Sequence, residues 1–199
     1  MASKDPHPYL VTARRTLTLE IEGIEALIAS LGEPFINAVE TMGTASGRVI
    51  VSGIGKSGHI GKKIAATLAS TGTPANFVHA GEASHGDLGM ITKDDVVLAL
   101  SWSGETAELR DLISYTKRFA IPLVSMTSGS ESALAEAADI ALLLPKVAEA
   151  CPNGLQAPTT STTMQLALGD ALATALLERN GFDTNNYKDF HPGGKLGAM

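Results

Sequence analysis

Short apolar runs alternate with helical patterns along most of the chain. Runs rich in β-branched residues predict strands at 48–53, 75–79, 95–101, 121–126 and 139–144. Apolar residues at helical spacing predict helices between and after them, at 57–71, 105–119, 131–137 and 159–179. Strands that alternate with helices form β-α-β units, which build a parallel sheet. The pattern therefore predicts an α/β protein whose ligand lies beyond the carboxyl ends of the strands.

The first fifty residues predict two more helices. Their apolar positions recur at helical spacing: Leu17, Ile21, Ile24 and Ile28, then Phe35, Ile36, Val39 and Met42. We expect these helices to pack on the sheet or on a partner subunit. Residues 1–46 are interpreted as N-terminal helices of the same domain, 47–180 as its core, and 181–199 as a polar, glycine-rich C-terminal segment.

Composition narrows the class of protein. With 199 residues, 44% of them hydrophobic, the chain can bury a full core as one domain. No apolar run approaches the roughly 20 residues of a membrane span and the start does not resemble a signal peptide, so a soluble, cytoplasmic protein is expected. The single cysteine, Cys151, excludes an internal disulfide. A net charge of −6 argues against nucleic-acid or acidic-membrane partners, so an anionic substrate needs a locally positive site.

A glycine-rich turn at 53–58, with the sequence GIGKSG, follows the first predicted strand and opens a helix. Such a turn directs backbone N–H groups at an anion. A Walker A motif would need glycine where Ile50 stands. The dinucleotide pattern G-x-G-x-x-G fits, with Glu82 near the offset of a ribose-binding acid, but it gives no role to Lys56 or Ser57. A turn without any ligand is the remaining alternative.

The segment 101–106, with the sequence SWSGET, is a second candidate anion site after a predicted strand. One serine there is most often only a helix cap, which contributes about 1 kcal/mol. Three hydroxyls exceed that need. Ser101, Ser103 and Thr106, together with Ser57, could donate to all the oxygens of one phosphate monoester, with Lys56 supplying positive charge. The combination favours a monophosphate over a dinucleotide.

Five motifs occur in order: VSGIGKSGHIG, STGTP, GEASHGDLGM, SWSGETAE and HPGGKLG. Together they resemble the sugar isomerase (SIS) fold and, more narrowly, the D-arabinose 5-phosphate isomerases of 3-deoxy-D-manno-octulosonate biosynthesis. The resemblance runs from about residue 15 to the end. It implies a three-layer α/β sandwich with a five-stranded parallel sheet in the flavodoxin-like order 2-1-3-4-5. It also implies interconversion of D-ribulose 5-phosphate and D-arabinose 5-phosphate in a homotetramer whose sites are completed by neighbouring subunits. The usual member continues into a pair of CBS domains, which would begin where this sequence stops.

Isomerisation through an enediol needs acid-base groups. Glu108 is the first candidate base, because it follows the 101–106 segment by about one helical turn; its alternative role is a first-turn acid that complements the helix dipole, worth about 0.3 to 1 kcal/mol. The resemblance implies catalytic roles for His191, in the HPGG motif, and for Lys56 and Glu149. For Glu149 a solvated loop acid is an almost equal alternative.

The resemblance further implies that the substrate site includes Gly55, Gly72, Thr73, His79 and His85. His85 is suited to ring opening, and His79 to binding zinc as an inhibitor; no cofactor is required. Two other functions stay open. A non-catalytic SIS sugar-phosphate sensor would keep the hydroxyl residues without the acid-base groups, and a nicotinamide oxidoreductase would bind NAD, which we do not expect.

Overall fold

The computed structural model describes residues 7–183, 186, 188 and 190. The α-helices are α1 (Pro8–Ser30), α2 (Glu33–Thr44), α3 (Gly55–Ser70), α4 (Ala80–Ala83), α5 (Arg110–Phe119), α6 (Ala133–Ala137) and α7 (Thr160–Arg179). The strands are β1 (Val49–Gly53), β2 (Ala75–His79), β3 (Val96–Leu100), β4 (Leu123–Thr127) and β5 (Ile140–Leu143). Within residues 7–183 there are also three short 3-10 turns: η1 (Asp87–Met90), η2 (Ala107–Leu109) and η3 (Pro152–Gly154).

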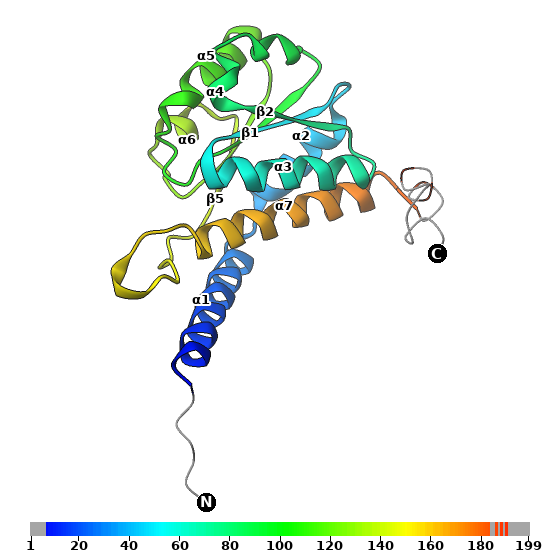
Figure 1. Cartoon of the computed structure of the whole chain (residues 1–199). Helices are drawn as coiled ribbons and strands as arrows, with labels where there is room; N and C mark the ends of the chain where they lie inside the picture. Colours follow the sequence, from blue (N-terminus) through cyan, green and yellow to red (C-terminus); the bar gives the residue numbers. More distant parts are fainter. Residues whose placement is uncertain (1–6, 184–185, 187, 189, 191–199) are drawn as a thin grey trace, which may run out of the picture.

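The five strands form one parallel sheet in the order β2-β1-β3-β4-β5, which confirms the predicted fold class (Figure 1). All residues of β1, β3 and β4 are buried, as expected of strands covered on both faces. The chain runs from β1 outward to β2 and then returns to β3 on the other side of β1. This reversal leaves a crevice between the carboxyl ends of β1 and β3, where such sheets bind ligands.

Helices cover both faces of the sheet and give it three layers. One core cluster joins the sheet to α1, α2, α3 and α7, and the other joins it to α4, α5 and α6. Leu27 of α1 and Val39 of α2 belong to the first cluster, together with Val51 of β1. The N-terminal helices therefore share the core of the sheet.

Two boundaries differ from the predictions for physical reasons. The fourth strand begins at Leu123, because Pro122 has no N–H to donate and serves only as an acceptor, from Val97. The predicted helix 105–119 begins with the 3-10 turn η2 and becomes α-helical only at Arg110. Side-chain oxygens of the 101–106 segment accept local backbone N–H groups there and compete with a helical turn.

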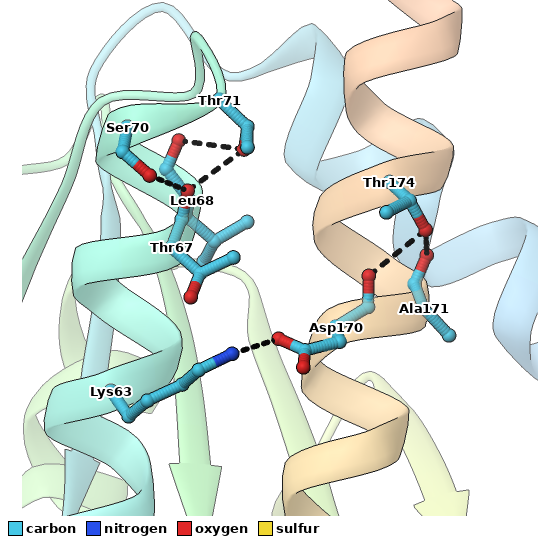
Figure 2. A network of polar contacts seen from close by, with 8 residues as sticks. All are labelled: Lys63, Thr67, Leu68, Ser70, Thr71, Asp170, Ala171 and Thr174. Atoms are coloured by element: carbon cyan, nitrogen blue, oxygen red, sulfur yellow. Dashed lines mark hydrogen bonds and ion pairs between the residues drawn. The ribbon is translucent and has the colours of Figure 1, made fainter. Parts of the chain in front are cut away.

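Helices α3 and α7 lie side by side and run in the same direction (Figure 1). Gly169 of α7 faces Ile64 of α3 so closely that any side chain at 169 would overlap it. An exposed ion pair joins Lys63 to Asp170 in the same interface, as Figure 2 shows. The parallel packing places the N-termini of both helices at the same end of the molecule.

The apolar stripe predicted on α1 is not its buried face. Leu17, Ile21 and Ile28 are 60%, 55% and 64% exposed, whereas Gly23 and Leu27 are buried. Thr160 and Met164 of α7 pack against Gly23, where small size allows close contact. The exposed stripe does not pack on the sheet within one chain. Among the helices that the structure describes, none combines the length and hydropathy needed to cross a bilayer.

Candidate active site

A cleft of about 340 Å³ lies beyond the carboxyl ends of β1 and β3, at the reversal of strand order. Its lining comes from three segments: Ile54, Lys56 and Ser57; Leu100, Ser101, Trp102, Ser103 and Thr106; and Pro158. The structure thus brings together both of the segments that the sequence marked as anion sites. Trp102 and Pro158 were not predicted, since a lone tryptophan and a proline in a long loop carry no chemical signal of their own.

The N-terminus of α3 opens into this cleft. Gly55 has φ +59°, a left-handed conformation that turns the chain sharply from β1 into the helix. The N-cap residue is Ile54, whose apolar side chain makes no capping hydrogen bond. First-turn N–H groups of a helix need an acceptor, and the helix dipole favours a negative one. This end of α3 is therefore built to accept an anion, with the exposed Lys56 adding a full positive charge.

The 101–106 loop is held in shape by its own hydroxyls. Ser101 is 3% exposed, and its Oγ accepts a hydrogen bond from the Gly104 N–H at 3.0 Å. The same Oγ lies 2.7 Å from Oγ1 of Thr106. Ser103 Oγ is exposed and accepts from the Glu105 N–H at 3.2 Å, which leaves its hydroxyl proton for a ligand. Ser101 mainly shapes the loop, while the exposed Ser103 and the half-buried Thr106 and Ser57 also line the cleft.

Glu108 lies in η2, just after Thr106, and its side chain is exposed beside the cleft rather than within its lining. Short helix α4 packs against η2 and brings the histidine-bearing loop to the same side. His79 ends β2 and pairs in register with Gly53, and its Nδ1 accepts a hydrogen bond from the Gly81 N–H at 3.2 Å. His85 is exposed beyond α4. His79 and α4 thus lie on the β2 side of the sheet, and none of these three side chains belongs to the cleft lining.

Glu149 fixes the loop that carries Pro158 by accepting hydrogen bonds at the end of that loop. Its Oε2 accepts hydrogen bonds from the Thr159 N–H at 2.6 Å and the Thr159 hydroxyl at 2.8 Å, with the Ser161 N–H at 3.4 Å. Burial by itself would raise the pKa of Glu149, but the hydrogen bonds from Ser161 and Thr159 outweigh it and lower the pKa below its ordinary value. The ionised carboxylate therefore occupies the N-terminus of α7.

Two of the predicted substrate-binding residues lie away from the cleft. Gly72 and Thr73 stand between α3 and the amino end of β2, at the opposite edge of the sheet from the cleft. Gly72 has φ +91° and packs against the ring of Phe182, and Thr73 is buried. Within one chain these residues do not join the other predicted substrate ligands. His191 lies outside the described residues.

No metal site with three or more His, Cys, Asp or Glu ligands occurs among residues 7–183, 186, 188 and 190. His79 has Nδ1 engaged as the cap of α4, so Nε2 is the nitrogen that would face a zinc ion. Binding of zinc by His79 stays a prediction.

Residues 44–175, two thirds of the sequence, match the SIS domain family. The chain belongs to the SIS domain family. This SIS domain is 57% identical over 189 residues to arabinose 5-phosphate isomerase KdsD of Pseudomonas aeruginosa, covering 95% of the chain and 58% of that relative. It is 55% identical to the protein of the same name from Yersinia pestis, over 92% of the chain and 56% of the relative. The chain thus spans little more than half the length of these curated relatives.

A protein of E. coli CFT073, solved in complex with arabinose 5-phosphate, superposes on this SIS domain with a TM-score of 0.90 at 40% identity. The match covers 95% of this chain and all of that one. The whole fold, including the N-terminal helices, is therefore shared with a protein whose structure contains a sugar phosphate.

Proposed function

We propose that this SIS domain is an aldose-ketose isomerase that interconverts D-arabinose 5-phosphate and D-ribulose 5-phosphate. The observation that carries the proposal is the cleft itself, where an uncapped helix N-terminus, Lys56 and hydroxyl-bearing side chains converge. That donor set matches one phosphate monoester. The names of the KdsD relatives and the sugar-phosphate complex of the E. coli protein support the choice of sugar.

In the proposed reaction the phosphate is bound by Ser57, Ser103 and Thr106, with Ser101 holding the loop. Glu108 removes the proton from C2 of the open-chain aldose. The resulting enediolate is stabilised by Lys56. The proton of the C2 hydroxyl passes to the C1 oxygen, and delivery of the abstracted proton to C1 gives the ketose. This transfer moves two hydrogens within one molecule and needs neither a redox cofactor nor a metal, so we propose that none is required and that zinc at His79 would inhibit.

We assign ring opening to His85 and a further catalytic role to His191, as the family resemblance implies. The carboxylate of Glu149 contributes negative charge, and its hydrogen bonds to Thr159 fix the loop that carries Pro158. Gly72 and Thr73 would serve the substrate only through a neighbouring subunit, so we propose a homotetramer. The exposed apolar stripe on α1 supports assembly, since three large side chains there are more than half exposed. We place the enzyme in the cytoplasm, supplying 3-deoxy-D-manno-octulosonate biosynthesis.

The test is to incubate the protein with D-arabinose 5-phosphate and measure D-ribulose 5-phosphate by NMR. Glu108→Gln should lower turnover by about 10²-fold or more while sugar-phosphate binding persists. Glu136→Gln is the matched control, because Glu136 is also an exposed first-turn acid, in α6. Binding without turnover by the folded wild type would overturn the isomerase proposal in favour of a sensor. Equal turnover in wild type and Glu108→Gln would remove Glu108 from the mechanism.

A further inference from the structure

The carbonyl oxygen of Trp102, inside the cleft-lining 101–106 loop, accepts an unusual number of hydrogen bonds. The Ser128 N–H donates at 2.9 Å, the Ser128 hydroxyl at 2.9 Å and the Thr127 hydroxyl at 3.1 Å. A carbonyl oxygen has two lone pairs, so three donors saturate it. Thr127 is fully buried and Ser128 is partly buried. The loop is thus attached to the end of β4 by two side chains in addition to the backbone.

The backbone part of this attachment follows from the sheet. β3 and β4 pair in parallel up to Leu100 and Met126, and the ladder continues as the Ser101 N–H donates to the Met126 carbonyl at 3.2 Å. The Ser128 N–H then donates to the Trp102 carbonyl just beyond the end of the paired strands. The two hydroxyl bonds are not part of any ladder. They are additions made by the side chains at 127 and 128.

The rest of the loop rests on the same stretch of chain, residues 127–133, which we call the supporting segment. Gly104 has φ +73°, and a Cβ there would lie 2.9 Å from the Thr127 Oγ1 and closer still to Ser132. The carboxylate of Glu105 accepts a hydrogen bond from the Ala133 N–H at 2.9 Å. Contacts at 102, 104 and 105 therefore fix the loop against the supporting segment along most of its length.

We propose that Thr127 and Ser128 are positioning residues for phosphate binding, acting through the Trp102 carbonyl. The inference rests on the proposed function insofar as the ligand is a sugar phosphate. Ser103 and Thr106 must present their hydroxyls in one geometry, and ligands on a loop depend on supporting hydrogen bonds to keep it. Loss of a supporting hydroxyl should loosen that geometry without changing any group that touches the substrate.

The experiment compares Thr127→Val and Ser128→Ala with wild type by calorimetric titration of inorganic phosphate and of D-arabinose 5-phosphate. Ser128→Ala removes one supporting hydrogen bond, worth about 0.5 to 1.5 kcal/mol, and should weaken both ligands by about threefold to tenfold. Thr127→Val also removes the acceptor of the Gly129 N–H, at 3.2 Å, and should weaken them at least as much. The KM should rise in parallel while kcat changes less than about threefold. Thr127→Ser should restore binding, because it retains the hydroxyl.

Thr116→Val is the matched control. Thr116 is 2% exposed, and its hydroxyl bonds only within α5, to the Ile113 carbonyl at 3.0 Å. The Thr116→Val variant should be less stable than wild type but should bind phosphate with the same affinity. Unchanged phosphate affinity in both Thr127→Val and Ser128→Ala would overturn the proposal, as would an equal loss in Thr116→Val. If wild type binds phosphate but does not isomerise the sugar, the proposed function fails while the titration still decides the role of the two hydroxyls.

Discussion

Glu149 offers the sharpest test of the electrostatics at this end of the molecule. Its Oε2 accepts two short hydrogen bonds from Thr159, at 2.6 and 2.8 Å, and a longer one from Ser161. Hydrogen bonds to a charged group contribute about 1.5 to 3 kcal/mol each when shielded from water. Because Glu149 is only partly buried, we expect a loss of about 2 to 3 kcal/mol in the free energy of unfolding for Glu149→Ala.

Glu149→Gln should cost about 1 kcal/mol, because the amide oxygen can still accept but carries no charge toward the helix N-terminus. The pKa of Glu149 is lower in the folded protein than its ordinary value of 4.5. The charge-dependent stability is therefore present above pH 4.5 and is lost as the pH falls through the folded pKa. The difference between wild type and Glu149→Gln should be largest near pH 7 and should shrink below about pH 4.5.

Urea denaturation at pH 7 and at successively lower pH measures this difference. Glu25→Gln on α1 is the matched control, an exposed acid whose loss should change the free energy of unfolding by less than about 0.5 kcal/mol at either pH. A Glu149→Gln variant as stable as wild type at pH 7 would refute the reasoning. So would a deficit that stays constant as the pH falls, because it would come from packing rather than charge.

Three further substitutions probe the packing and the cleft. Gly169→Ala should lower the free energy of unfolding by about 1 to 3 kcal/mol in urea denaturation, because the methyl group overlaps Ile64; equal stability would contradict the close packing of α3 and α7. Gly104→Ala should weaken phosphate binding, measured by calorimetry, at least tenfold, or about 1.4 kcal/mol, because Gly104 is left-handed and a Cβ there would overlap Ser132. Unchanged affinity would argue against a role of this loop in phosphate binding. Ser103→Ala should raise KM more than it lowers kcat in steady-state assays, and a pure kcat effect would oppose a binding role.

The sheet was predictable because its strands are nearly continuous apolar runs between turn residues. Val49–Gly53 and Val96–Leu100 carry the pattern of strands buried on both faces, and both are fully buried in the structure. The two candidate anion-binding segments follow those strands directly. Since parallel strands end at one edge, their meeting in one cleft follows from the fold class.

Other features depend on contacts that no local pattern contains. The apolar periodicity of α1 predicted a buried stripe that includes Leu17 and Ile21. The face that is buried instead contains Gly23, because its lack of a side chain leaves room for Thr160. Gly72 lies at the far edge of the sheet because it follows a helix rather than a strand. The proposed role of Glu108 came from its position one helical turn after the 101–106 segment, whereas the catalytic roles of His191 and Glu149 came only from the family resemblance.

The two parallel helices α3 and α7 explain the location of the proposed anion site. Both present an N-terminus to the same end of the molecule, and each end attracts negative charge (Figure 1). At α7 the chain supplies that charge itself, since Glu149 accepts from the first N–H groups and holds the Pro158 loop. At α3 the cap is Ile54, which supplies none. The proposed phosphate site therefore lies at α3, because the carboxylate of Glu149 already accepts hydrogen bonds at the N-terminus of α7.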